Sequence, residues 1–236
     1  MPSPGSGDGL VHSYVATKHD RAADWEPVYS IAPRTLAPVL REFVDDEGEL
    51  QRSLELARWG LHPAWAKDKG PRPINARMET VATNGMFRGS FSSGRAVVPM
   101  TGYYEWVEAP DGGKDPFFIH HPEGQLLHAA GLTAARRSED GDGWDVTFTV
   151  ITREARDASG EVHDRMPAFL TEEALADWLA PGKLGAEQKD PLLAQLEEIS
   201  TTVAGQLVTA AVDRQVNNVR ALDRSDPTLI KPVTET

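Results

Sequence analysis

Three separated stretches of the sequence hold polar side chains that could do chemistry. The first is INARMET, residues 74–80, in which Asn75 and Arg77 are two positions apart. Side chains two apart share one face of an extended segment. The Arg77 guanidinium could hold a phosphate with its fixed fork of donors, and the Asn75 amide could hold a substrate oxygen. When this stretch is considered alone, a helix cap is the more common role for such an asparagine.

The second stretch is GYYEW, residues 102–106, in which Glu105 lies among three aromatic residues of an apolar segment. Such surroundings desolvate a carboxylate, which raises its pKa and allows it to carry protons near neutral pH. The alternative is a strand glutamate that faces water or pairs with an arginine.

The third stretch is VHDRMPAFL, residues 162–170, which places an imidazole, a carboxylate and a guanidinium in a row. Asp164 or a backbone carbonyl could fix the tautomer of His163. Pro167 biases Met166 toward extended geometry, so HDRMP is predicted to be a rigid loop and not a helix. A lone histidine is usually structural, so this stretch is weak evidence by itself.

These residues need a scaffold, and the sequence predicts a sheet. Alternating apolar and polar residues indicate strands, with Gly, Pro and Asp in the connections between them. No alternation of strand and helix of the kind that builds a parallel sheet is present. We therefore expect an α+β fold: one domain over residues 11–236 with an antiparallel, strand-rich, barrel-like core decorated by helices, after a flexible tail over residues 1–10. The predicted strands lie within 53–61, 95–108, 116–121, 125–133 and 144–152, and the predicted helices within 78–91, 171–180 and 187–200.

Composition excludes several classes of protein. The 236 residues are 40% hydrophobic and 25% charged, and no apolar run approaches the ~18–20 residues of a membrane span. The N-terminus has no basic and apolar signal regions, so we expect a cytoplasmic protein. Zero cysteines exclude disulfides, thiolate metal sites and cysteine nucleophiles from this chain.

The charge is segregated along the chain. A net charge of -12 disfavours a general nucleic-acid binder. Residues 52–106, however, hold eight basic and four acidic residues, a net +4, whereas residues 171–200 hold two basic and seven acidic residues, a net -5. We therefore expect one basic face, centred on Arg77, on an acidic body.

Taken together, the motifs resemble the SRAP family, the SOS-response-associated peptidases that are also called abasic site processing proteins. The similarity rests on INAR with ET, then G-x-YEW, then HDRMP, in that order. It runs from about Tyr29 to QVNNVR, residues 215–220, and WGLHPAWA, FRGSF, PFFI, AAGL and TVIT fit the same pattern. The resemblance implies a single SRAP-type domain that acts on abasic sites in single-stranded DNA during the DNA damage response.

The resemblance also implies a chemistry. Members of the family form a covalent link to the abasic site from an N-terminal cysteine. An α-amine with a pKa of about 7.7–8.0 can attack the sugar aldehyde, and the thiol then closes a thiazolidine ring. The implied catalytic residues are Asn75, Glu105 and His163. The implied DNA-binding residues are Arg77, Thr152, Trp65 and Arg88, with Trp59 and Trp106 as further stacking or packing surface.

This sequence departs from the family at the nucleophile. The family opens Met-Cys-Gly-Arg and an aromatic residue, and only LVHSYVATK aligns here, which sets Val11 on the cysteine and Tyr14 on the aromatic. Ser30 stands where the family usually has asparagine. Crosslinking and peptidase activity are therefore doubtful. The alternatives are non-covalent binding of single-stranded DNA and interaction with a repair partner. The implied partner is single-stranded DNA with an abasic site, which would place the protein at the nucleoid when bound, with no cofactor, metal or membrane.

Overall fold

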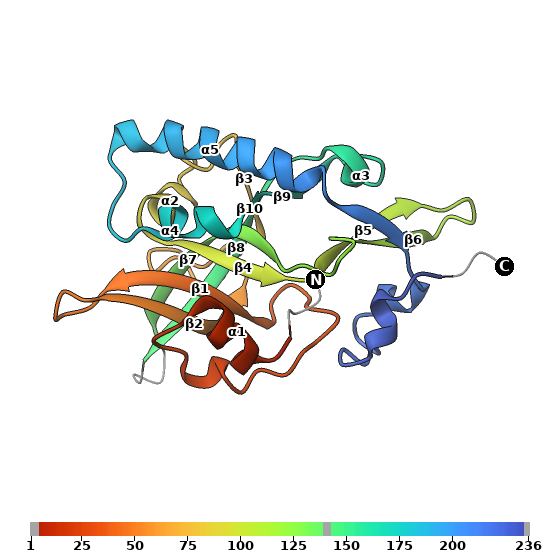
Figure 1. Cartoon of the computed structure of the whole chain (residues 1–236), viewed down its shortest axis with the longest axis horizontal. Helices are drawn as coiled ribbons and strands as arrows, with labels where there is room; N and C mark the ends of the chain where they lie inside the picture. The colour runs from red at the N-terminus through yellow and green to blue at the C-terminus, as the bar shows by residue number, and fades with distance from the viewer. Residues whose placement is uncertain (1–4, 139–142, 234–236) are drawn as a thin grey trace.

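The larger of two sheets closes on itself. The structure, a computed structural model, describes residues 5–138 and 143–233. Strands β7, β4, β1, β2 and β8 pair in that order, and β8 pairs again with β7, which makes a five-stranded barrel (Figure 1). Three short strands extend it: β3 and β9 pair with β8, and β10 pairs with β7. The strands of this sheet are β1 (Leu36–Val44), β2 (Leu50–Trp59), β3 (Asn75–Arg77), β4 (Arg95–Met100), β7 (Leu127–Arg137), β8 (Trp144–Glu154), β9 (Arg165–Pro167) and β10 (Phe169–Leu170).

A second, three-stranded sheet has the order β11-β6-β5. Its strands are β5 (Gly102–Glu108), β6 (Lys114–His120) and β11 (Val208–Ala211). The predicted strand segment 95–108 is thus divided between the barrel and this sheet. Gly102 makes the transition possible, because a Cβ there would lie 2.4 Å from the Phe118 ring and 2.5 Å from the Ile119 carbonyl oxygen. The antiparallel, strand-rich α+β architecture and the single domain are confirmed.

Helices cover the barrel, with α5 crossing it along one side (Figure 1). The predicted helix over 171–180 is confirmed as η2 followed by α4, and that over 187–200 lies within α5. The prediction over 78–91 is wrong for most of its length, because turns fill it until Arg88; the Asn84 side chain accepts from the Met86 amide at 2.8 Å and competes with helical bonding. The helices are α1 (Gly7–Tyr14), η1 (Asp20–Ala22), α2 (Arg88–Ser93), α3 (Asp157–Gly160), η2 (Glu172–Ala174), α4 (Leu175–Leu179), α5 (Ala186–Ala204), η3 (Arg214–Asn217) and η4 (Pro227–Ile230).

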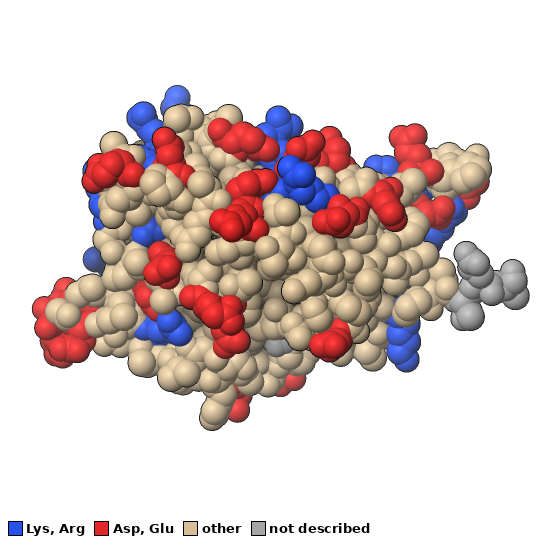
Figure 2. Space-filling view, turned by 45° about the horizontal axis from the view of Figure 1, so that its top comes forward, with Lys and Arg blue, Asp and Glu red and all other residues tan. Residues whose placement is uncertain are grey.

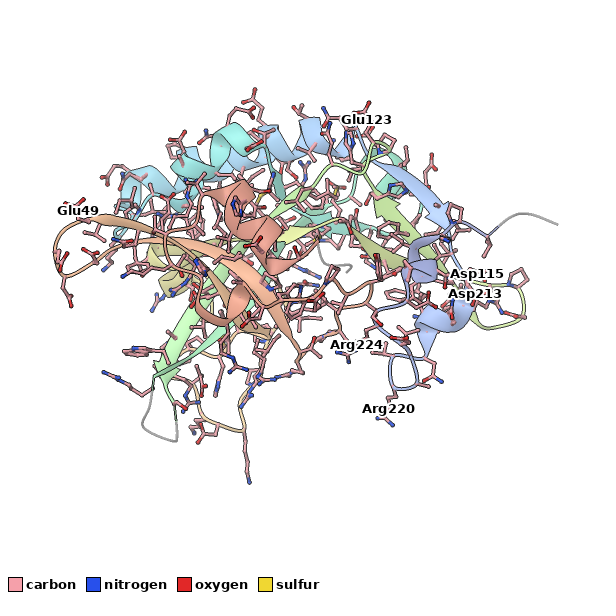
Figure 3. All side chains as sticks on the ribbon, turned by 60° about the horizontal axis from the view of Figure 1, so that its bottom comes forward. Glu49, Asp115, Glu123, Asp213, Arg220 and Arg224 are labelled. Carbon is pink, nitrogen blue, oxygen red and sulfur yellow. The ribbon has the colours of Figure 1, made fainter. Side chains whose placement is uncertain are left out.

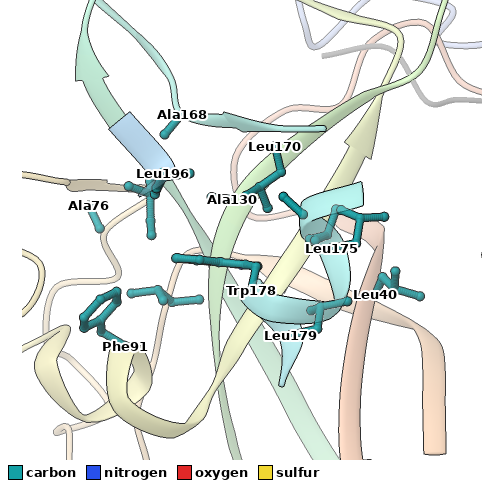
Figure 4. Packing of buried hydrophobic residues seen from close by; sticks show 14 of the residues in the cluster. Leu40, Ala76, Phe91, Ala130, Ala168, Leu170, Leu175, Trp178, Leu179 and Leu196 are labelled. Carbon is teal, nitrogen blue, oxygen red and sulfur yellow. The ribbon is translucent and has the colours of Figure 1, made fainter. Parts of the chain in front are cut away.

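The barrel strands bury side chains on both faces. In β4, all six residues are buried: Val97 packs into one apolar cluster, while Ala96 and Val98 pack into another. The first cluster continues into the helices through Trp178 of α4, which is 1% exposed (Figure 4). Its ring lies 6.2 Å from that of Phe91, and its indole nitrogen donates to the Ala96 carbonyl at 2.8 Å. Trp178 therefore fixes α4 to the barrel wall.

Helix α1 occupies part of the stretch expected to be a flexible tail. Residues 7–10 form its first turns, and Leu10 and Tyr14 are buried against the barrel. The Tyr14 hydroxyl and the His128 imidazole on β7 are 2.8 Å apart. The boundary expected at residue 10 thus falls inside a docked helix, and residues 1–4 lie outside the described residues.

Candidate functional site

A cavity of about 540 Å³ lies between the larger sheet and β5 of the smaller one. Five of the residues singled out from the sequence line it together, although they come from four separate segments: Asn75, Arg77, Glu105, Thr152 and His163. We call this space the first cavity.

Strand β3 presents Asn75 and Arg77 to the first cavity. It pairs in parallel with β8, so that Asn75 is in register with Val150 and Arg77 with Thr152. Ala76 between them is fully buried, which turns both polar side chains to the opposite, exposed face. The shared face is as predicted, whereas the helix cap for Asn75 is replaced by a strand. Within the described residues neither side chain has a hydrogen bond or ion pair, so both are available to a ligand.

Glu105 is half-buried on β5 between Tyr104 and Trp106. Desolvation raises the pKa of its carboxyl above the ordinary value; His163, when charged, opposes this shift, and Asp164 adds to it. The direction agrees with the expectation from the aromatic surroundings. A carboxyl with a raised pKa holds its proton more readily than an exposed one, which suits it to proton transfer or hydrogen bonding with a ligand.

His163 lies on the loop between α3 and β9 with its side chain 42% exposed. Its Nδ1 lies 3.0 Å from the Arg165 backbone nitrogen and 3.2 Å from the Arg165 carbonyl oxygen, so it can accept from the first or donate to the second according to the tautomer. The Asp164 carboxylate lies 3.2 Å from the same Nδ1 and can pair with it once the ring is charged. The segment that follows is extended as predicted, and forms β9 against β8.

Arg165 is a residue of the first cavity that sequence reasoning did not single out. Its two terminal nitrogens donate to the Glu79 carboxylate at 2.6 and 3.1 Å, and one also donates to the Thr152 carbonyl at 2.7 Å. This bonding lowers the pKa of Glu79. Its Nε is buried without a hydrogen-bond partner in the described residues. The Arg165 guanidinium thus links the turn after β3 to β9, and so holds the segments of Asn75 and His163 together. The sequence signals this pair only by an acidic residue in the first stretch and a basic residue in the third, which are 86 positions apart.

The C-terminal segment contributes the rim of the first cavity. Val216 and Val219 line it, and Asn217 accepts from the Trp106 indole nitrogen at 2.7 Å. Trp59 lines the barrel side, where its ring stacks on Phe148. Ser30, which replaces the family's usual asparagine, is also buried in the lining. The rest of the lining is mostly apolar or aromatic: Ile31, Ala32, Pro33, Ile74, Met100, Tyr103, Tyr104, Val150, Met166 and Pro167.

Three residues singled out from the sequence lie elsewhere. Trp65 is 66% exposed on the connection between β2 and β3, and Arg88 is exposed at the start of α2. Val11, the position aligned with the family's cysteine, belongs to α1 and packs against the first apolar cluster. None of the three lines the first cavity.

The expectation of one basic face centred on Arg77 stays a prediction. Arg77 is the member of the basic segment 52–106 that lines the first cavity, while Arg95 is buried and donates to backbone carbonyls, and Arg52 pairs with Glu42. On the face that α5 crosses, acidic side chains are prominent and basic ones are scattered (Figure 2). Figure 3 places Arg220 and Arg224 on the C-terminal segment, at the opposite end from Glu49. A segment's net charge does not fix where its side chains point.

The described residues offer neither a metal-binding cluster nor a membrane-spanning helix. They contain no group of three or more His, Asp or Glu side chains placed to hold a metal ion. No helix among them is long and apolar enough to cross a bilayer.

Comparison with known proteins decides the family. The profile of the SOS response associated peptidase (SRAP) family matches residues 7–219, which is most of the chain. The chain belongs to the SRAP family. Among curated proteins, this SRAP chain is 33% identical over 220 residues to the abasic site processing protein YedK of Escherichia coli, covering 92% of this chain and 90% of that one. It is 30% identical to YoqW of Bacillus subtilis, covering 79% and 81% of the two chains.

More distant relatives share the same region. The abasic site processing protein HMCES of Xenopus tropicalis is 30% identical over 203 residues, and this SRAP chain spans 60% of its length. A solved structure of a Bacteroides thetaiotaomicron protein has a TM-score of 0.73 at 21% identity, with 99% of each chain covered. That likeness shows that the fold is shared.

A Glu105→Gln variant of this SRAP chain is expected to be more stable at pH 7 by about 1–3 °C in Tm. Because the folded-state pKa of Glu105 is raised, its stabilising contribution is present below the ordinary value of 4.5 and lost as pH rises through the folded pKa. The two proteins should therefore melt together near pH 4 and separate toward pH 7. Thermal melts across this range test it, and a larger gap at pH 4 than at pH 7 would contradict the shift.

Proposed function

We propose that this SRAP chain binds single-stranded DNA at abasic sites, with the sugar of the lesion in the first cavity. The observation that carries the proposal is the meeting of Asn75, Glu105 and His163 in one space of about 540 Å³, with Arg77 at its side. A volume of roughly 300–1,000 Å³ is typical of small-ligand sites. The names of the abasic site processing relatives support the same assignment.

The polar and tryptophan side chains of the lining have the following roles in this proposal. The Glu105 carboxyl and the His163 imidazole hydrogen-bond to the oxygens of the sugar, and the Asn75 amide orients it. Arg77 binds the phosphate beside the lesion, since its guanidinium has no partner among the described residues. Trp59 and Trp106 offer apolar surface beside the sugar.

The covalent step of the family is not part of this proposal. The 236 residues contain no thiol, and Val11, which aligns with the family's cysteine, is half-buried and packs against the first apolar cluster. An amine alone would give only an imine that water reverses, because no thiazolidine can close. We therefore expect non-covalent recognition within the DNA damage response, and with it a cytoplasmic protein that joins the nucleoid when bound. The observation of a missing thiol favours this over peptidase chemistry.

Binding and gel assays test the proposal together. A labelled single strand with one abasic site is expected to bind more tightly than the same strand intact, by fluorescence anisotropy. After heating, a denaturing gel should show free DNA only. Equal affinity for the two strands would refute lesion recognition, and a heat-stable adduct would refute the non-covalent mode. Borohydride in a parallel sample reports any transient imine.

An Arg77→Ala variant is expected to bind the abasic strand several-fold more weakly at low salt. Loss of one phosphate contact should also reduce the slope of log affinity against log salt concentration by about 0.7. Arg156→Ala is a matched control, because Arg156 is exposed and lines neither the first cavity nor the cavity lined by Arg58 and Arg136. A salt slope unchanged in Arg77→Ala, or reduced as much in Arg156→Ala, would exclude this role.

A further inference from the structure

A second cavity of about 520 Å³ lies between the start of β1, the end of β2 and the paired ends of β7 and β8. It shares no lining residue with the first cavity. Four arginines line it, from four separate segments: Arg21, Arg58, Arg72 and Arg136. The function proposed above uses none of them.

Three of these arginines have no carboxylate partner among the described residues. Arg136 donates to the Asp68 carboxylate at 2.9 Å, and the lining residue Glu55 pairs with Arg41. Among the described residues, Arg21 and Arg72 have no hydrogen bond or ion pair. Arg58 donates one bond, to the Arg34 carbonyl at 2.8 Å, which orients its guanidinium and leaves its other donors open.

Against these three charges stands Asp145, the remaining carboxylate of the lining. The net charge of the unpaired groups is therefore positive, in a protein whose overall charge is -12. Guanidinium groups that line one cavity repel one another. A phosphate group is a fitting partner, because two of its oxygens can each accept from one guanidinium in a bidentate pair. The second cavity thus has the chemistry of a phosphate site.

The second cavity also offers a surface for a base. Trp144 lines it and is 59% exposed, and the Arg137 guanidinium lies 4.4 Å from its ring centre. An exposed indole that is held by a guanidinium is a stacking platform for an unpaired base. Guanidinium groups that can bind phosphate, next to an aromatic ring that can stack on a base, suit a nucleotide rather than a simple anion.

The two cavities lie on either side of the same chain segments. On β2, Arg58 lines the second cavity and its neighbour Trp59 the first; at the end of the connection, Arg72 lines the second and Ile74 the first. The connection between them, residues 60–74, exposes Lys67 as well as Trp65. A single strand leaving one cavity can follow this edge into the other.

We propose that the second cavity binds the phosphates of a flanking nucleotide segment of the same single strand. This rests on the proposed function, since the lesion is taken to occupy the first cavity. Arg21, Arg58 and Arg72 hold the phosphates, and Trp144 stacks an unpaired base. The site recognises the backbone, so it works on damaged and intact strands alike.

The test compares strands of about five and about fifteen nucleotides, lengths within the range that single-strand grooves bind. Wild type should bind the longer strand more tightly. In the triple variant Arg21→Gln/Arg58→Gln/Arg72→Gln, the ratio of the affinities for the long and the short strand should fall about tenfold at low salt. Its slope of log affinity against log salt concentration should fall by about 2. A control with the same charge change, Arg156→Gln/Lys183→Gln/Lys231→Gln, removes exposed charges outside both cavities and should keep the length effect.

Further arms separate the outcomes. A triple Arg→Lys variant at the same positions should recover part of the gain, and thermal melts show that each variant is folded. An unchanged length effect in the glutamine variant, or an equal loss in the control, overturns the inference. So does binding of dTMP that the glutamine variant abolishes while the length effect persists, because the cavity would then hold a free nucleotide. Equal affinity for abasic and intact strands, with the length effect intact, would refute only the proposed function.

Discussion

A Trp178→Ala variant is expected to lose about 3–5 kcal/mol of the free energy of unfolding, the usual cost of truncating a large buried aromatic. Trp178 is 1% exposed, contacts Phe91, and donates its indole N–H to the Ala96 carbonyl inside the barrel wall. Truncation would leave a cavity between α4 and β4 and an unpaired buried carbonyl. In a chain of this size the loss corresponds to a fall in Tm of roughly 10 °C.

Chemical denaturation of both proteins measures the difference directly. Trp178→Phe separates the two contributions, since it keeps most of the volume and removes only the hydrogen bond; its loss should be clearly smaller. If Trp178→Ala cost less than about 1 kcal/mol, the packing of α4 against the barrel would not be as described.

A Tyr103→Phe variant is expected to lose about 1–3 kcal/mol, because it leaves a buried hydroxyl unpaired. The Tyr103 hydroxyl lies 2.8 Å from that of Ser159, which is 1% exposed. Burial raises the pKa of Tyr103, so the hydroxyl stays protonated. The bond joins β5, which carries Glu105, to α3, which leads to His163. Its removal should therefore also weaken binding of abasic single strands, by loosening one wall of the first cavity.

A double-mutant cycle checks this assignment. Ser159→Ala removes the other partner, and the double variant should be less destabilised than the sum of the two single variants. Strictly additive losses would show that the two hydroxyls do not interact.

The sequence predicts the strands of this fold well where alternation is regular, as in β8. It does not reveal β1, because Pro38 argues against a strand inside a sheet; the structure tolerates it where β1 pairs with β4 only near Leu40. Nor does it reveal α1, whose Gly-rich sequence favours a loop. That helix depends on Ser6 as its cap and on burial of Leu10 and Tyr14, which are tertiary effects.

For the candidate site too, local patterns could be predicted and contacts between distant segments could not. Residues within a motif, such as Asn75 and Arg77, could be assigned to one face from their spacing. Arg165 and the C-terminal rim at Val216 could not, because their place depends on pairings between distant segments. The exposed Trp65 shows the converse: the residue type suggests a site, but the backbone carries it away from the first cavity.

The parallel pairing of β3 with β8 also determines when binding competence arises during folding. Asn75 pairs with Val150, which lies five strands later in the chain, and His163 follows later still. Contacts between distant segments carry a large loop-closure entropy and form slowly. During refolding, helix and hairpin signals should thus recover first. Affinity for single strands should return last. An incompletely folded chain would therefore expose the apolar surface of the barrel before it can bind its ligand.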